Sequence, residues 1–572
     1  MKRNWNILAP DADLVDRLIR NLQCHPITAA VLVNRDIQTE KEVSEFLNVS
    51  LKNLRSPFEL KDMQYAVERI YRAISNHENI LLFGDYDVDG ITATAILLDF
   101  LGRIGATVTA YIPHRLNEGY GLQISHITHL ARPNKIDLVI TADCGSTNFE
   151  AVAKARELGI DIIITDHHSL DKKVPPALAV INPKRHDCIA GLENLAGVGV
   201  AFALIICLRK YLRDQHFWEN QNEPNLKSFC DLVALGTVAD MVPLTQENRI
   251  LSKTGLDIIN TNCRTGIKAL LHAAGVEEQS TDEQDIAFRL APRLNAAGRM
   301  AHASIAVDLL ITTDAQRADQ IAQSLNSYNY QRRDMENKII SDIRQFLARE
   351  PRILERKTLV LWNRQWHEGV LGIVASRMVE RYYRPVVLLA VKDQICKGSA
   401  RSIPGVDLYD RLSACSPVLD KFGGHAMAAG LSLAPENLEA FQSRFEDIVG
   451  ESLSPDDLVP ELMVDREIKI AEISDRLIDE IESLAPFGAG NPEPVFMSRN
   501  VRIVSSKIVG SHHRRMVLTQ ADNTNAKNIN AIQFNADTGQ ASQEAFDKIA
   551  FKIRWNRWRG TKTAQLIVED TR

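Results

Sequence analysis

The 572-residue sequence predicts an α/β protein with a parallel sheet, a long helix that leads to a second α/β domain, and a small C-terminal β-barrel. Three patterns predict this fold. From residue 79, short apolar runs alternate with helical stretches, which is typical of a parallel sheet covered on both faces. Residues 314–350 form a polar-rich helical segment without Pro or Gly. The last hundred residues contain five short strand-like runs, which favour a small barrel such as the OB-fold.

Composition narrows the class of protein. A chain of 572 residues is too long for one core, so three or four domains are expected. No apolar run approaches the roughly 18 residues of a membrane span, and the first residues do not resemble a secretory signal. The eight cysteines are scattered without a C-x-x-C pair, which favours a reducing, cytoplasmic location. The net charge is −6, so any nucleic-acid footprint must be local.

These patterns divide the chain into five parts. The first is a helical segment without recognisable chemistry, and the second contains the strand runs "NILLFG", "TVTAYIP", "IDLVITA", "IDIIIT" and "ALAVINP". The last part holds the barrel strands, and several prolines precede those strands. In order, the predicted parts are residues 1–60, 61–313, 314–350, 351–452 and 453–572.

The stretch "ILLFGDYDVDG" places Asp85, Asp87 and Asp89 directly after an apolar strand. Three carboxylates this close repel one another unless a cation lies among them. An EF-hand loop would need Glu at its twelfth position, which is Ile96, and would follow a helix. The glycine patterns of dinucleotide and P-loop sites are absent. A solvated acidic turn remains the alternative to a cation site.

Other acidic and imidazole groups follow the later apolar runs. Asp143 ends "LVITAD", Asp166, His167 and His168 end "IIITDHH", and Asp240 ends "LGTVAD". A parallel sheet would bring the groups that follow its strands to one edge. Carboxylates with a neutral imidazole and no thiolate suit Mn²⁺ or Mg²⁺. The ligands outnumber what one ion takes, so we expect two ions that share a carboxylate, an arrangement suited to phosphoester hydrolysis.

The motifs "DYDVDG", "TADCG", "TDHH" and "GTVADMVPL", in this order, resemble those of the DHH phosphoesterases. Further motifs, among them "IPHRLNEGYG", "APRLNAAGRM", "WHEGVLGIVASR" and "KFGGHAMAAG", are similar to those of the single-strand-specific exonucleases of that family. The resemblance implies a DHH domain, a linking helix, a DHH-associated domain and an OB-fold. It also implies roles for the acidic cluster: metal ligands at Asp85, Asp87, Asp89, Asp143, His167 and Asp240, with Asp143 bridging, and catalytic groups at His168 and Asp166. Asp85 is either a ligand or a close neighbour of the ligands.

Candidate substrate-binding residues lie in both α/β domains. "WHEGVLG" lacks the second histidine of a zincin because Leu371 occupies that position. "GSARS" and "GGH" together offer a hydroxyl, a guanidinium and backbone amides, which suit the terminal 5′ phosphate implied by the resemblance. A tight packing turn is the alternative for "GGH", and a buried structural role is the alternative for the arginines. The residues are Arg115, Arg293, Asn295, His367, Ser399, Arg401, Gly423, Gly424 and His425.

The C-terminal run "KIRWNRWRGTK" interleaves aromatic and basic residues, namely Trp555, Arg557 and Trp558. Bases stack on aromatic faces while cations meet the phosphates, which is how single strands are bound without sequence preference. A place for one tryptophan in the barrel core is the alternative.

The resemblance predicts an exonuclease that degrades single-stranded DNA 5′→3′ to 5′-mononucleotides, in DNA recombination and repair, with two Mn²⁺ or Mg²⁺ ions. A phosphatase for very short oligonucleotides and a non-catalytic DNA-binding scaffold are the alternatives. The C-terminal barrel argues against the first and the intact aspartates against the second. The resemblance further implies a single-strand-binding protein and a RecQ-type helicase as partners, and no membrane. The physics of the sequence alone leaves open the polarity, activity on RNA, the metal used in the cell and the oligomeric state, although a monomer is expected.

Overall fold

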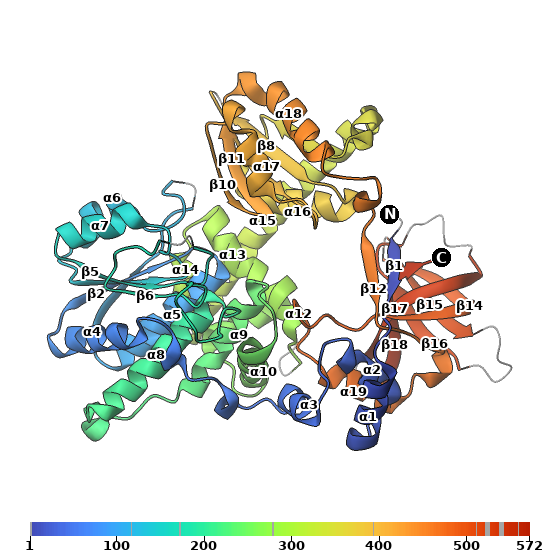
Figure 1. The fold of residues 1–572 in the computed structure, drawn as a ribbon, viewed down its shortest axis with the longest axis horizontal. Helices are drawn as coiled ribbons and strands as arrows, with labels where there is room; N and C mark the ends of the chain where they lie inside the picture. The colour runs from blue at the N-terminus through green and yellow to red at the C-terminus, as the bar shows by residue number, and fades with distance from the viewer. Residues whose placement is uncertain are drawn as a thin grey trace. The chain divides into compact units, whose positions relative to one another are not determined.

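The computed structural model describes residues 3–115, 117–170, 173–276, 280–392, 394–510, 512–520, 527–536, 543–558 and 560–572, with Asn220 and Trp558 described by their backbone alone. The chain forms two compact units (Figure 1). One contains Tyr328–Met463 with the residues up to Asn6, and the other contains Ile7–Ser327 with Val464–Arg572. The division falls inside the long helix α15 (Ala315–Arg349).

The larger unit contains the predicted parallel sheet, with strand order β3-β2-β4-β5-β6. Every neighbouring pair in it is parallel. Successive side chains of a strand point to opposite faces. Leu81 and Phe83 pack on the side of α7 (Phe149–Glu157), while the opposite face meets α5 (Val88–Arg103) and α8 (Gly197–Asp214). Burial on both faces explains the continuous apolar runs. The strands are β2 (Asn79–Gly84), β3 (Thr107–Tyr111), β4 (Leu138–Ala142), β5 (Asp161–Thr165) and β6 (Ala179–Ile181).

Helices complete this part of the unit. Asp314 begins α15 by accepting hydrogen bonds from Gln316 N and Arg317 N, and the helix then continues for 35 residues without Pro or Gly. The remaining α-helices of this part are α4 (Met63–Ser75), α6 (Ile124–His126), α9 (Cys230–Ala239), α10 (Gln246–Thr261), α11 (Thr265–Ala274), α12 (Glu283–Asp285), α13 (Ala291–Met300) and α14 (Ser304–Ile311).

The C-terminal barrel belongs to the same unit. Its strands run in the order β14-β15-β16-β18-β17, and β14 pairs with β17 to close it. The N-terminal helices share its core, because Leu18 and Ile27 pack in one apolar cluster with barrel residues such as Phe496. The elements are α1 (Ala12–Leu22), α2 (Pro26–Val33), α3 (Glu40–Leu47), α19 (Asp475–Ser483), β13 (Arg466–Glu467), β14 (Phe496–Val509), β15 (His513–Gln520), β16 (Ile529–Gln533), β17 (Ala545–Trp558) and β18 (Thr561–Thr571).

The smaller unit contains a mixed sheet of order β10-β11-β9-β8-β7. One face packs on the C-terminal half of α15, through Ile339 and Ile343, and on α16. The other packs on α17 and α18 through Phe441 and Phe445. The elements are β7 (Leu359–Asn363), α16 (Leu371–Tyr382), β8 (Val386–Lys392), β9 (Ile395–Arg401), α17 (Leu408–Ala414), β10 (Lys421–His425), β11 (Ala428–Leu433) and α18 (Leu438–Gly450). A two-stranded sheet joins β1 (Asn4–Ile7) and β12 (Glu461–Val464).

The predicted fold class is confirmed: a parallel sheet, a long helix, a second α/β domain and a closed five-stranded barrel. The four boundaries at 60, 313, 350 and 452 stay a prediction, since the compact units group the chain more coarsely and place the N-terminal helices with the barrel. Among the described residues, no helix combines the length and the apolar character needed to cross a bilayer.

Candidate metal centre

The carboxyl ends of three adjacent strands carry the acidic cluster. Asp85 follows β2, Asp143 follows β4 and Asp166 follows β5, and each backbone N–H donates to the next strand in the sheet. The N···O distances are 3.1 Å from Asp85 to Ala142, 2.9 Å from Asp143 to Thr165 and 3.1 Å from Asp166 to Ile181. The ladder therefore extends one residue past each strand and fixes the three aspartates along one edge.

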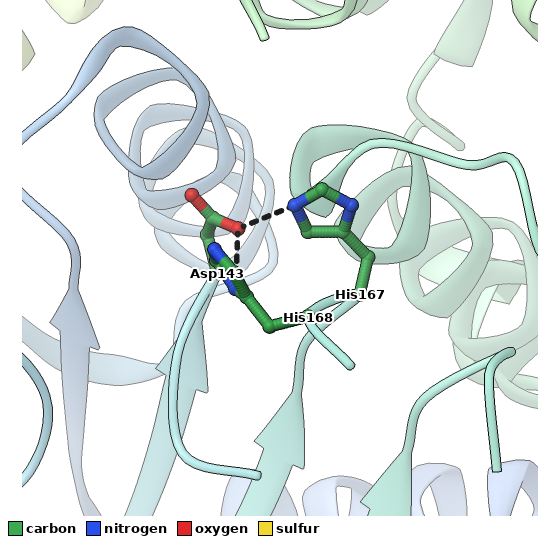
Figure 2. A group of neighbouring side chains, drawn as sticks. All are labelled: Asp143, His167 and His168. Carbon is green, nitrogen blue, oxygen red and sulfur yellow. Dashed lines mark ion pairs between the residues drawn. The ribbon is translucent and has the colours of Figure 1, made fainter. Parts of the chain in front are cut away.

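His167 lies at the centre of the cluster. Its Nε2 is 3.3 Å from Asp143 Oδ1, and it is 3.6 Å from Asp89 Oδ2 and from Asp240 Oδ2. Figure 2 shows that both His167 and His168 approach the same carboxylate oxygen of Asp143, with His168 Nδ1 3.7 Å from Asp143 Oδ1. Asp240 arrives from a different element, since it caps the C-terminus of α9.

Three overlapping groups of side chains present ligand atoms within 4.8 Å of one another. Asp143 and His167 each belong to two of the groups. This sharing is what a pair of ions held by a common carboxylate requires. The groups are Asp143 with His167 and His168, Asp89 with His167 and Asp240, and Asp85 with Asp87 and Asp143.

Neighbouring backbone groups fix the orientation of these carboxylates. Asp89 accepts hydrogen bonds from Gly197 N at 2.6 Å and Val198 N at 2.8 Å, at the N-terminus of α8, where the helix dipole favours an anion. Position 197 needs glycine because a Cβ there would lie 2.4 Å from Asp143 Oδ1. Asp143 itself has φ 65°, a left-handed conformation that is rare outside glycine and often found at functional sites.

Ionisation of these carboxylates is unfavourable in the folded protein when no cation is bound among them. Burial, followed by the charges of neighbouring aspartates, raises the pKa of Asp85, Asp89 and Asp143 well above the usual range. Burial and the charge of Asp87 raise the pKa of Asp240 to about 7. Bound cations would restore the ionised forms.

The donor atoms fit divalent cations. Among the described residues, Asp85 Oδ1, Asp143 Oδ1 and both ring nitrogens of His167 are buried without a hydrogen-bond partner. Burial and then the charge of His168 lower the pKa of His167 to about 3, so its imidazole is neutral, as a metal ligand must be. Hard oxygen donors with one neutral imidazole suit Mn²⁺ or Mg²⁺.

His168 is held differently from His167. Its Nδ1 lies 2.8 Å from Asp166 Oδ1 and 3.2 Å from the hydroxyl of Tyr120. Burial alone would lower the pKa of His168, but the hydrogen bond and charge of Asp166 outweigh it and raise this pKa to about 9. In turn, the hydrogen bond and charge of His168 overcome burial and hold the pKa of Asp166 below its usual range. Asp166 therefore orients the His168 ring through its Nδ1.

Sequence reasoning missed three residues around this centre: Tyr120, Asn182 and Lys184. Tyr120 contacts His168, and Asn182 follows β6 just as the aspartates follow their strands. Lys184 is exposed, and its positive charge partly offsets the rise that burial causes in the pKa of Asp240. The only sign of Asn182 in the sequence is its position directly after an apolar run. This sign is weak, because asparagine is common after strands.

The candidate substrate residues of the same unit lie in two places. The guanidinium of Arg115 lies 4.8 Å from the ring centroid of Tyr86, the residue between Asp85 and Asp87 in the sequence. The positive charge of Arg115 partly offsets the rise that burial causes in the pKa of Asp85. Arg293 is buried and donates to Asn326 Oδ1 at 3.0 Å and to Arg289 O at 2.6 Å. Asn295 lies on the same helix, α13, and is half-buried.

The smaller unit gathers some of its candidates around the start of α16. A Cβ at Gly372 would lie 2.9 Å from Arg401 Nη2 and 3.6 Å from Ser399 Oγ, so both side chains lie against the first turn of that helix. His367 Nδ1 accepts a hydrogen bond from Gly369 N at 3.2 Å just before it. Gly423, Gly424 and His425 are exposed on the edge strand β10.

The C-terminal candidates contact acidic groups of α19. Trp555 is half-buried against the barrel core, and its Nε1 donates to Asp479 Oδ1 at 2.8 Å. Arg557 pairs with Glu482 at 2.5 Å, and Lys562 lies 4.2 Å from the Trp555 ring centroid. A hollow of about 380 Å³ borders Trp555 and Lys562. The side chain of Trp558 lies outside the described residues.

Comparisons with known proteins place these parts in named families. Residues 79–237 match the model of the DHH family N-terminal domain, residues 355–451 that of the DHHA1 domain, and residues 464–570 that of the RecJ OB domain. The single-stranded-DNA-specific exonuclease RecJ of Salmonella typhimurium is 36% identical over 583 residues, covering 100% of this chain and 99% of the relative. The chain belongs to the RecJ family.

Solved structures of the RecJ family agree with the fold. RecJ of Thermus thermophilus in complex with Mn²⁺ superposes with a TM-score of 0.84 at 29% identity, covering 100% of this chain and 79% of that one. The Mg²⁺ complex of the same protein gives a TM-score of 0.77 at 28% identity, covering 100% and 78% of the two chains. Both complexes contain an ion that the acidic cluster suits.

Proposed function

We infer that this chain is a metal-dependent exonuclease that degrades single-stranded DNA 5′→3′ to 5′-mononucleotides by phosphodiester hydrolysis with two ions, in DNA recombination and repair. The observation that carries the inference is the buried cluster of carboxylates around His167, with ligand atoms that lack a hydrogen-bond partner among the described residues. Membership of the RecJ family supports single-stranded DNA as the substrate.

The acidic cluster would hold two Mn²⁺ or Mg²⁺ ions. Asp85, Asp87 and Asp143 form one group of ligands, and Asp89, His167 and Asp240 form the other, with Asp143 close to both. Divalent ions in such a pair lower the pKa of water and neutralise charge on the attacking and leaving oxygens. The protein contributes the fixed positions of the carboxylates, which the extended ladder and the N-terminus of α8 determine.

His168 is proposed to bind the scissile phosphate rather than an ion, with Asp166 as the residue that orients it. Asp166 accepts from His168 Nδ1, so the proton on that nitrogen is held and Nε2 points away from the aspartate. In the metal-free protein the pair with Asp166 raises the pKa of His168 to about 9, and a ring protonated in this way would donate from Nε2 to a phosphate oxygen. Arg115, Arg293 and Asn295 are proposed to hold neighbouring phosphates.

End recognition is assigned to the smaller unit. Arg401, Ser399 and His367 lie at the start of α16, where a guanidinium, a hydroxyl and backbone N–H groups can bind the extra charge of a 5′ phosphate. Gly423, Gly424 and His425, exposed on the edge strand β10, are proposed to contribute to the same phosphate site. Trp555, Arg557 and Trp558 are proposed to bind the rest of the strand by stacking and charge.

The proposal includes a cytoplasmic location and two protein partners. All eight cysteines lie among the described residues as free thiols, which suits a reducing compartment. A single-strand-binding protein and a RecQ-type helicase are proposed as partners from the sequence resemblance alone.

Digestion of end-labelled DNA tests the function. Single-stranded and duplex oligonucleotides, labelled at either end, are incubated with the full chain in Mn²⁺, Mg²⁺ or EDTA. We expect 5′-mononucleotides from the single strand only, released from the 5′ end, and no product in EDTA. Asp143→Ala should abolish cleavage, and Asp319→Ala, an exposed aspartate of α15, is the matched control. Cleavage of trinucleotides without cleavage of long strands would favour a small-substrate phosphatase, and metal-dependent cleavage by Asp143→Ala would contradict the metal assignment.

A further inference from the structure

Asn182 is a buried residue at the end of β6, beside the metal centre but outside the ligand groups. Its side chain is fully buried and makes three hydrogen bonds of 2.9 Å. The amide Nδ2 donates to Ser146 Oγ and to the backbone carbonyl of His168, and Oδ1 accepts from Lys184 N. One side chain thus joins the loops that follow β4, β5 and β6.

These bonds close a ring that includes the His168 imidazole. Asn182 donates to Ser146, Ser146 N donates to Asp166 Oδ2 at 2.9 Å, and Asp166 Oδ1 accepts from the His168 ring. The His168 carbonyl then accepts from Asn182, which completes the ring. The position of His168 is therefore fixed from its side chain through Asp166 and from its backbone through Asn182.

The ring depends on the amide group. Aspartate has the shape of asparagine but offers only acceptors, so it would face the His168 carbonyl with an oxygen. A buried carbonyl without a donor is costly, and the loop would move to find one. His167, on the same loop, is fixed independently by its packing among Asp89, Asp143 and Asp240.

We propose that Asn182 is a positioning residue that sets the backbone of the His167–His168 loop, and with it the reach of His168 toward the scissile phosphate. This inference rests on the proposed function. Residues that orient a side chain at a metal centre typically change activity by about 10- to 100-fold when replaced. We expect the loss in kcat rather than in KM, because Asn182 is buried and does not touch the substrate.

The test compares Asn182→Asp with a matched control in the full chain. Asn491 is equally buried, and its Nδ2 donates to two carbonyls, those of Leu484 at 2.9 Å and Pro486 at 2.8 Å. Asn182→Asp should lower kcat about 10- to 100-fold, with KM and Mn²⁺ affinity, measured by electron paramagnetic resonance, within about threefold of wild type. Asn491→Asp should leave kcat unchanged, because this buried amide orients no active-site group.

A double-mutant cycle identifies the group through which Asn182 acts. If it acts through His168, Asn182→Asp adds no more than about twofold to the loss already caused by His168→Gln. Ser146→Ala breaks the same ring at another point and should show the same non-additivity, which keeps the test valid if Asn182→Asp folds poorly. Losses that multiply in the double variants, or equal losses in Asn491→Asp, would overturn the proposal.

Hydrogen exchange provides a readout that does not depend on activity. In EDTA, the amides of residues 163–170 should exchange faster in Asn182→Asp than in wild type, and at the wild-type rate in Asn491→Asp. Unchanged exchange in Asn182→Asp would overturn the proposal even in an active enzyme. Absence of nuclease activity in wild type, together with faster exchange in Asn182→Asp, would reject the proposed function and retain the positioning role.

Discussion

Replacement of Asp240 by asparagine should stabilise the metal-free protein while removing its activity. Burial and the charge of Asp87 raise the pKa of Asp240 from 3.8 to about 7. A change of one in pKa corresponds to about 1.4 kcal/mol, so a rise of about three corresponds to a cost of about 4 kcal/mol for ionised Asp240 in the folded protein. Neighbouring aspartates share the repulsion, so about 4 kcal/mol is an upper limit for the gain.

The sign of the pH dependence follows from the raised pKa. In the unfolded chain Asp240 ionises near pH 3.8, and in the folded metal-free protein near pH 7. The folded state therefore loses stability as the pH rises from about 3.8 to 7, and the full cost is present above pH 7. Asparagine removes this cost, so the variant should match wild type near pH 4 and exceed it most at about pH 8.

Thermal unfolding of the full chain measures both effects. In EDTA at about pH 8, Asp240→Asn should melt several degrees above wild type, since 1 kcal/mol corresponds to about 2–4 °C for a domain of 150–250 residues. With Mn²⁺ at about a hundred times its Kd, wild type should gain about 2.7 kcal/mol and the variant much less. Asp319→Asn serves as the control on an exposed site. A variant that melts at or below wild type under these alkaline, metal-free conditions would refute the view that this cluster needs a cation.

Three further outcomes are expected. Arg401→Ala should reduce the ratio of cleavage rates for 5′-phosphorylated over 5′-hydroxyl strands, and Arg401→Lys should restore part of it because an ammonium lacks the planar fork; an unchanged ratio in Arg401→Ala would remove this residue from end recognition. Trp555→Ala should weaken binding of long oligonucleotides by about 1–3 kcal/mol, measured by fluorescence anisotropy, and leave trinucleotide cleavage unchanged; equal losses on both would assign the ring to the core. Burial and the charge of Asp282 raise the pKa of Glu283 to about 7. Glu283→Gln should therefore stabilise the protein by roughly 3 kcal/mol at about pH 8 and leave its stability unchanged near pH 4.5. Equal melting temperatures at the higher pH would show that ionised Glu283 does not destabilise the folded protein.

The sequence alone was sufficient for the elements and for the residues of the acidic cluster. Strands buried on both faces are continuous apolar runs, so the runs before Asp85, Asp143 and Asp166 identify β2, β4 and β5 without knowledge of their neighbours. Their order along the chain and the parallel connections then bring the following residues to one edge. The absence of Pro and Gly over 35 residues likewise identifies α15.

Other features were decided by contacts between residues far apart in the chain. Asp89 is held by Gly197, 108 positions away, and no local pattern reveals that bond. The basic residues near Trp555 predict a DNA-binding surface, yet Arg557 forms an ion pair with Glu482 on α19. The sequence does not distinguish these cases, because it does not show whether solvent or a carboxylate lies next to a basic side chain. The division of labour between adjacent histidines is of the same kind. The sequence by itself determined which residues surround the metal centre, since the apolar runs that precede them are local patterns. Only the tertiary structure decided that His167 faces three carboxylates, while His168 is oriented by Asp166 and Asn182. The reason is that these partners come from different loops of the chain.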